Sequence, residues 1–172
     1  PWIGIFIIIT VTVLVYLNSL RVPFNLDDVS SIVNNPSVHL EKLSFEEVKK
    51  ALGNNRPVSN LSFALNYYFG GFDVFGYHVV NLFAHCITAV LVYIFFLKTL
   101  PVSSPIFAFL GSLLWAIHPV HTQAVTYVVQ RMTGLATMFF MWSLVLYIQG
   151  GENKGPKRIW LIILAKGAGF LG

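Results

Sequence analysis

Long apolar runs decide what this chain can fold into. The run from Trp2 to Leu20 carries no charged residue and approaches the ~20 residues that a helix needs to cross a bilayer. It lacks the basic start and the small-residue cleavage site of a signal peptide. Further runs lie at about residues 79–97, between 100 or 105 and 117, at 132–148, and beyond Ile159. We therefore predict an all-α fold, a polytopic transmembrane helix bundle of about five spans.

The composition supports a multi-pass integral membrane protein. Hydrophobic residues make up 56% of the 172 residues and charged residues 10%, whereas a soluble domain has roughly a quarter charged residues. The net charge of +4 comes from scattered residues, which argues against nucleic acid as a partner. Cys86 is the one cysteine, so no internal disulfide can form. Both ends, Pro1 and Gly172, lie close to apolar runs, so we expect residues 1–172 to be one transmembrane domain, the first part of a larger one.

The polar segments predict a topology. Alternating spans put residues 21–77 and 118–131 on one side of the membrane and the short loops near 98–104 and 150–158 on the other. The short loops hold four basic residues against one acid, and the segment 21–77 holds five against six. Because basic short loops tend to stay in the cytoplasm, we expect residues 21–77 to form a long loop on the outward or lumenal side.

A short amphipathic helix is predicted within this loop. Ser44 precedes Glu47 by three residues, the spacing of a capping box, and Gly53 suits the end of the helix. Phe45, Val48 and Leu52 would share one face. That face would either lie on the membrane surface or dock on the bundle.

Two adjacent acids, Asp27 and Asp28, follow the first span in FNLDDVSSIVNNP. Neighbouring carboxylates near a membrane interface suit a general base, a metal ligand or a partner for a basic group. The alternative is a turn or helix-start pair, because aspartate caps helices readily.

Polar side chains also mark the start of the second span. His78, Asn81 and His85 would form one stripe on a helix. Polar groups inside a span are costly unless they face the bundle interior or a watery cavity, and the alternative to a site is hydrogen bonding between helices. Arg56 precedes Pro57, which favours an extended backbone before the next segment.

The segment HPVHTQAVTYVVQR, residues 118–131, predicts a new helix that starts near Pro119. His118 and His121 would lie at its N-terminal end, and Gln123, Tyr127, Gln130 and Arg131 along one side. Arg131 suits a phosphate or carboxylate clamp. The alternatives are an interfacial helix with snorkelling polar groups and, less favoured, a zinc site at the two histidines. All three blocks fall on the outward side, where a lipid-linked anionic substrate could be handled.

Four ordered blocks resemble a known family: F-x-L-D-D with I-V-N-N-P at 24–36, R-P-V-S-N-L-S-F-A-L-N-Y at 56–67, G-Y-H-x-x-N-L-x-x-H at 76–85, and the segment 118–131. The chain resembles the N-terminal membrane half of the GT-C superfamily of lipid-dependent glycosyltransferases. The likeness is strongest to tetratricopeptide-repeat membrane proteins related to protein O-mannosyltransferases. It covers most of residues 20 to 150.

The resemblance implies transfer of a sugar from a polyprenyl-phosphate carrier to a protein hydroxyl. Asp27, with Asp28 a little less favoured, matches the family's catalytic base. Arg56 and Arg131 match the arginines that face the donor phosphate, and His78, Asn81, His85, His118, His121 and Gln123 would support the site. Whether a divalent cation binds stays open, with Asp27 and Asp28 as its expected ligands.

The chain also departs from the family pattern. Gln123 stands where relatives often carry an acid, and the last run reads AKGAGFLG in place of a Ser-Lys-Glu-like block. The alternative function is a non-catalytic, truncated subunit that scaffolds a larger membrane complex through partner subunits. A transporter is less favoured, because the first four spans lack the charges of an ion path.

Overall fold

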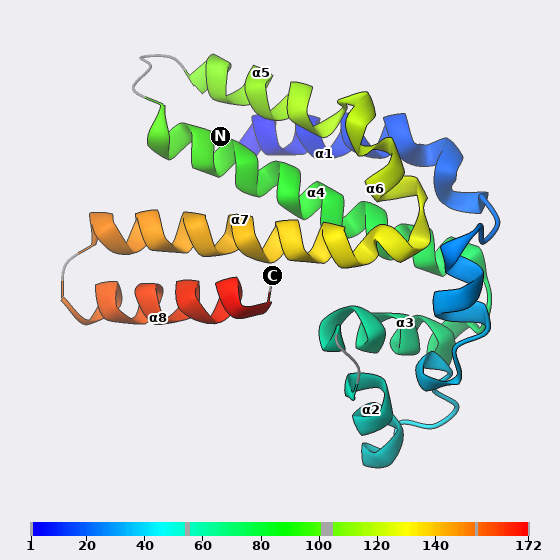
Figure 1. The fold of residues 1–172 in the computed structure, drawn as a ribbon. Coiled ribbons are helices and arrows are strands. Elements are labelled where there is room, and N and C mark those ends of the chain that lie inside the picture. Colours follow the sequence, from blue (N-terminus) through cyan, green and yellow to red (C-terminus); the bar gives the residue numbers. More distant parts are fainter. Residues whose placement is uncertain (1, 54–55, 101–104, 154, 172) are drawn as a thin grey trace.

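The computed structural model describes residues 2–53, 56–100, 105–153 and 155–171, and every regular element in these ranges is helical. The α-helices are α1 (Trp2–Tyr16), α2 (Phe45–Leu52), α3 (Pro57–Gly70), α4 (Val74–Thr99), α5 (Pro105–Ala116), α6 (Thr122–Thr126), α7 (Arg131–Glu152) and α8 (Pro156–Leu171). Short 3₁₀ or π turns are η1 (Leu17–Arg21), η2 (Val29–Val33), η3 (Pro36–Val38), η4 (Pro119–His121) and η5 (Val128–Gln130). Figure 1 shows the long helices stacked side by side and a separate lobe with α2 and α3.

Among the described residues, three helical segments are long and apolar enough to cross a membrane: Trp2–Arg21, Val74–Thr99 and Val128–Glu152. The shorter apolar helix α5 has 12 residues, which at 1.5 Å per residue gives about 18 Å against a ~30 Å hydrocarbon core. Helix α8 has 16 residues and contains Lys166. The all-helical, membrane-type fold is confirmed, and spans at α5 and α8 stay predictions.

The bundle core forms where the long helices cross. Ile8 of α1, Ala89 and Tyr93 of α4 and Ala108 of α5 are buried in one cluster. A second cluster joins α4 to α7 through residues such as Leu91 and Met138. Helix α8 runs back along α7 (Figure 1), and Gly150 lets the two approach closely, because a Cβ there would lie 3.1 Å from Ile162 Cγ1.

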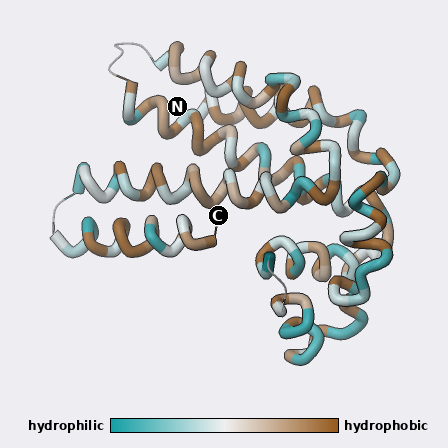
Figure 2. Tube along the Cα trace, viewed as in Figure 1, coloured by the Kyte–Doolittle hydropathy of each residue, from teal (hydrophilic) through white to brown (hydrophobic). Residues whose placement is uncertain are grey.

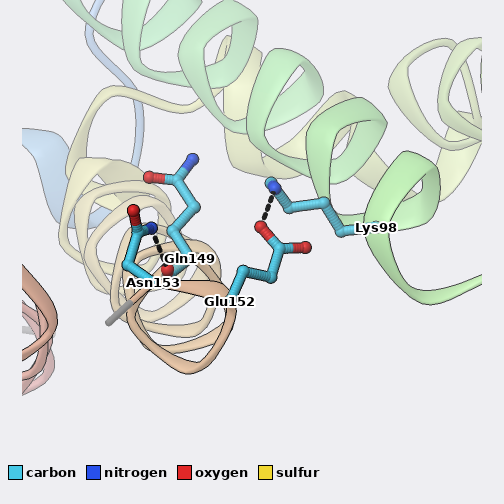
Figure 3. Close-up of polar contacts among 4 residues, drawn as sticks. All are labelled: Lys98, Gln149, Glu152 and Asn153. Atoms are coloured by element: carbon cyan, nitrogen blue, oxygen red, sulfur yellow. Dashed lines mark hydrogen bonds and ion pairs between the residues drawn. The ribbon is translucent and has the colours of Figure 1, made fainter.

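An ion pair connects the C-terminal ends of α4 and α7. Lys98 near the end of α4 points toward Glu152 at the end of α7 (Figure 3), and Asn153 beside it donates a hydrogen bond to the Gln149 carbonyl. Both helices therefore end on the same side, as the alternating topology requires. Lys154, another basic residue of this loop, lies outside the described residues.

The segment 21–77 folds into a lobe with its own core. Hydrophilic residues concentrate in this lobe, whereas the long helices are mostly hydrophobic (Figure 2). Its buried residues come from the turns, from α2 and α3, and from the bundle: Ile32, Val38, Leu40, Ala51, Phe63, Ala64, Tyr77 and Val128. Helix α3 was not among our predicted elements. Its side chains close the lobe core against the bundle.

The amphipathic helix is confirmed as α2, with Ser44 at its N-cap accepting a hydrogen bond from Glu47 N at 3.3 Å. The reciprocal half of the capping box was wrong. Glu47 Oε2 instead accepts from Glu41 N and Lys42 N, both at 3.0 Å, because Ser44 N already donates to the Lys42 carbonyl.

The α2 helix docks on the lobe rather than presenting its whole apolar face to a membrane. Ala51 is buried and Val48 packs against the lobe core. Phe45, expected on the same face as Val48, is 79% exposed, and Leu52 is exposed as well.

Candidate functional site

The site is organised by a break between α6 and α7. The predicted single helix from Pro119 onward was wrong, because α6 ends at Thr126 and Tyr127 adopts an extended backbone with φ −96° and ψ 115°. The turn η5 follows, and α7 begins at Arg131. Figure 1 shows the chain crossing from α6 to α7 over the first part of α4.

Two polar side chains satisfy the backbone groups that this break exposes. Asn81 Nδ2 donates to the carbonyls of Tyr127 at 3.2 Å and Val128 at 3.3 Å. Asp28 Oδ1 accepts from Val129 N at 2.7 Å. An unpaired backbone group buried away from water costs several kcal/mol in hydrocarbon. These contacts therefore allow a non-helical segment beside the bundle.

Arg131, the first residue of α7, is buried, with 1% of its surface exposed. All its described hydrogen-bond partners are uncharged groups. Nε donates to Asn81 Oδ1 at 2.7 Å and Nη2 to the Tyr77 carbonyl at 2.8 Å. Nη1 donates to Ser62 Oγ and Asn66 Oδ1 of α3. The guanidinium carbon lies 4.5 Å from the Phe63 ring centre, a cation–π distance.

The structure separates the two acids of the predicted pair. Asp28 is buried, and its second oxygen, Oδ2, accepts from Asn25 N at 3.1 Å. Asp27 is exposed, and its side chain makes no hydrogen bond with any described residue. Its backbone N–H donates to the Tyr127 hydroxyl at 2.9 Å. The preceding Leu26 has φ 44°, a strained value for a residue other than glycine. The turn thus aims one carboxylate inward and leaves the other free.

The histidines serve different parts of the fold. His78 and His85 lie on α4 in the predicted stripe with Asn81, and all three are buried. His78 Nε2 donates to the Val22 carbonyl at 2.8 Å and ties the first loop to α4. His85 Nε2 donates to the Ala116 carbonyl at 2.8 Å and ties α5 to α4.

His118 and His121 lie at the turn before α6. His118 is exposed, and its Nδ1 accepts from Val120 N at 3.2 Å. His121 is half-buried with its ring centre 4.4 Å from that of Trp115. Burial, together with His118, lowers the pKa of His121 below its usual value, so its imidazole is neutral at pH 7.

Arg56 and Gln123 lie outside the buried network. Arg56 is exposed at the start of α3, with its guanidinium against the Met132 sulfur. It lines a groove of about 480 Å³ with Ser59, Thr133 and the end of α8. Gln123 is exposed on α6. The structure therefore brings Asp28, Asn81 and Arg131 together around the break, and leaves Asp27 and Arg56 at exposed positions.

A divalent cation at Asp27 and Asp28 stays a prediction. Both oxygens of Asp28 already accept backbone hydrogen bonds. In the described part of the chain, no three His, Cys, Asp or Glu side chains gather where they could hold a metal.

Sequence reasoning placed Tyr127 on the polar side of its segment but missed its contact with the acid turn, and it missed the roles of Ser62 and Asn66. Tyr127 supplies a hydroxyl to the acid turn, and Ser62 and Asn66 supply acceptors to Arg131. The four-residue spacing of Ser62 and Asn66 puts both on one face of a helix. That spacing and the place of both residues in the block at 56–67 were the available signals.

Comparison with known proteins identifies relatives. The chain is 34% identical over 175 residues to the Caenorhabditis elegans protein O-mannosyl-transferase F38B6.6, covering 94% of this chain and 25% of the relative. It is 34% identical to the human protein O-mannosyl-transferase TMTC3, covering 90% of this chain and 18% of the relative. Its homologues are protein O-mannosyl-transferases.

The Xenopus laevis protein O-mannosyl-transferase tmtc2 is likewise 34% identical, with 90% of this chain and 20% of the relative covered. The chain thus spans a quarter or less of the length of these O-mannosyl-transferases. No family model and no solved structure matches. The expected likeness to O-mannosyltransferase relatives is confirmed. Membership of the GT-C superfamily and a tetratricopeptide-repeat region stay predictions.

Proposed function

We propose that this chain is part of a GT-C-type membrane glycosyltransferase that moves a sugar from a polyprenyl-phosphate carrier to a protein hydroxyl on the outward face. The names of its relatives support the reaction class. The observation that carries the proposal is the divided acid pair: Asp28 is built into the fold, whereas Asp27 is exposed on a turn that Tyr127 holds.

Asp27 acts as the general base. Its carboxylate takes the proton of the acceptor hydroxyl as the hydroxyl oxygen attacks the anomeric carbon of the sugar. The bond between that carbon and the phosphate oxygen breaks, and polyprenyl phosphate leaves with the bonding electron pair. Arg56 is exposed, one of its guanidinium nitrogens contacts the Met132 sulfur, and its other donors can bind the phosphate charge that grows in this step.

Arg131 supports the site by position. Its donors are engaged by Asn81, Ser62, Asn66 and the Tyr77 carbonyl, so it secures the break that holds Asp28. A direct phosphate contact by Arg131 would require some of these hydrogen bonds to open. We therefore assign the phosphate to Arg56 first.

The test separates the two acids in the full-length protein, reconstituted in liposomes with a polyprenyl-phosphate mannose donor. We expect Asp27→Asn to reduce transfer by at least ~100-fold, a typical general-base contribution, with an unchanged thermal midpoint. Asp28→Asn is expected to lower the thermal midpoint, because an amide N–H₂ would face a backbone donor. Glu41→Gln, at an exposed acid of the same loop, is the control. Wild-type transfer by Asp27→Asn would rule out the assigned base.

The second candidate is a scaffolding subunit without catalysis. It is favoured because Asp28 and Arg131 form hydrogen bonds within the protein, and a role in stabilising the fold is enough to account for both residues. Stoichiometric co-purification with membrane partners, combined with no binding of the donor lipid, would support the subunit over the transferase.

A further inference from the structure

A small cavity of about 200 Å³ lies between α4, α5, α6 and α7, next to the network around Arg131. Its lining includes Asn81, His85 and Thr88 of α4, Trp115 of α5 and, from α7, Thr133 and Thr137. Drug-sized ligand pockets usually measure about 300–1,000 Å³. This cavity therefore suits one small ring rather than a larger molecule.

The polar groups of the cavity are mainly acceptors. Thr88 Oγ1 donates to the Ala84 carbonyl and Thr137 Oγ1 to the Thr133 carbonyl, both at 2.8 Å. Thr133 Oγ1 donates to Gln130 Oε1 at 2.9 Å. Each hydroxyl thus already donates its one hydrogen bond, and its remaining lone pairs can accept a hydrogen bond from a ligand. A ligand with several O–H donors matches such a lining.

Aromatic rings form one side of the same cavity. The Trp115 ring stacks on His85, with centres 5.2 Å apart, and His121 lies 4.4 Å from Trp115. His121, which also lines the cavity, is neutral at pH 7 because its pKa is lowered by burial and by His118. A neutral imidazole keeps one nitrogen as an acceptor.

The charge next to the cavity narrows the ligand class. Arg131 Nε lies 2.7 Å from Asn81 Oδ1, and Asn81 lines the cavity. This buried positive charge disfavours a cationic ligand. The acceptor-rich lining disfavours an anion. What remains is a neutral ring with several hydroxyl groups and a C–H face for the aromatic side.

We infer that this cavity binds the sugar ring of the polyprenyl-phosphate donor, with the threonines as hydroxyl acceptors and Trp115 against the ring face. The inference rests on the proposed glycosyltransferase function for the identity of the ligand. It adds a sugar-recognition site, between α4, α5, α6 and α7, to the acid turn and Arg56.

Gly134 allows a clean test because it lines the cavity and a Cβ at this position would meet no atom within 4 Å. Gly134→Ala and Gly134→Leu therefore fill the cavity from within α7. Both residues form helix better than glycine, so the fold is expected to hold. Gly151, also on α7 with open space at its Cβ, offers Gly151→Leu as the matched control.

The measurement is equilibrium binding of two probes to the full-length protein in detergent: polyprenyl-phosphate mannose and polyprenyl phosphate without a sugar. We expect Gly134→Leu to weaken binding of the mannose-bearing lipid by at least about tenfold, a usual effect of obstructing a fitted pocket. Gly134→Ala should weaken it less. Binding of polyprenyl phosphate, and both affinities of Gly151→Leu, should match those of the wild-type protein.

Two results would overturn the inference: wild-type affinity of Gly134→Leu for the mannose-bearing lipid, or equal loss of both lipids. The binding measurement needs no turnover, so it stays separate from the base assignment. If Asp27→Asn transfers normally while Gly134→Leu discriminates between the two lipids, the assigned base fails and the sugar site stands. If Asp27→Asn is inactive while Gly134→Leu binds both lipids normally, the sugar site fails and the base stands.

Discussion

At the scale of single residues, burial divides side chains that look alike in the sequence. Asp28 is 1% exposed and Arg131 is 1% exposed, whereas their counterparts Asp27 and Arg56 lie at the surface. The buried members of both pairs hydrogen-bond to neutral partners rather than to each other in the contacts described. The proposed function therefore assigns substrate chemistry to the exposed Asp27 and Arg56, and the positioning of the site to the buried Asp28 and Arg131.

Arg131→Lys tests the geometric role of the buried arginine. A lysine has three donors on one nitrogen and cannot reproduce the planar fork that reaches α3 and α4 together. We expect a loss of about 3 kcal/mol of stability, typical for breaking a buried charged network, and a thermal midpoint in detergent lower by several degrees. Arg158→Lys, at an exposed arginine of α8, should leave the midpoint unchanged. Equal midpoints for the two variants would contradict this role.

At the scale of elements, the central feature is the break at Tyr127. The extended residue places its hydroxyl against Asp27 N and its carbonyl against Asn81. One short segment thereby joins the acid turn, α4 and the start of α7. Loss of this geometry would move the proposed base without removing it.

Tyr127→Phe isolates the contact between the break and the acid turn. It removes one hydrogen bond, worth about 1 kcal/mol, and leaves an exposed N–H that water can satisfy. We expect the rate of sugar transfer, kcat, to fall by up to about tenfold, with an unchanged KM for the donor and a thermal midpoint lower by at most a few degrees. Tyr147→Phe, at an exposed tyrosine of α7, serves as the matched variant. A higher KM for the donor with an unchanged kcat would contradict a positioning role for Tyr127.

Apolar runs predicted the long helices well, because a helix that must satisfy its backbone in lipid shows itself in composition. The stripe of His78, Asn81 and His85 was also predictable from its spacing. The break at Tyr127 was not, because the segment 120–130 contains neither glycine nor proline. The break is stabilised by two distant side chains. Asn81 lies 46 residues before its partner Tyr127, and Asp28 lies 101 residues before its partner Val129. Sequence patterns within one segment do not predict hydrogen bonds to residues so distant in the chain.

At the scale of the whole molecule, the polar blocks gather at one end of the bundle. The acid turn contacts the break, and the N-terminal parts of α4 and α7 meet at Arg131. The opposite end carries the Lys98–Glu152 pair. The predicted outward loop and the predicted cytoplasmic loops thus lie at opposite ends of the same bundle.

Labelling from either side of a membrane tests which end faces outward. In a Cys86→Ala background, we expect Lys157→Cys in sealed microsomes to react with a membrane-impermeant maleimide, because its loop is predicted to be cytoplasmic. Val120→Cys and Phe45→Cys, at positions 69% and 79% exposed, should react once detergent opens the vesicles. Labelling of all three cysteines before detergent is added would refute the predicted orientation.

The partners of Arg131 have a consequence for biosynthesis. Ser62, Asn66, Tyr77 and Asn81 all precede it in the chain, so the ribosome has made every acceptor before α7 emerges. Placing a charged residue in a membrane without partners costs free energy, whereas here the hydrogen-bond acceptors of the arginine have already been synthesised. The order of synthesis thus makes these acceptors before the arginine, and moving α3 behind α7 in a permuted chain would reverse that order for Ser62 and Asn66.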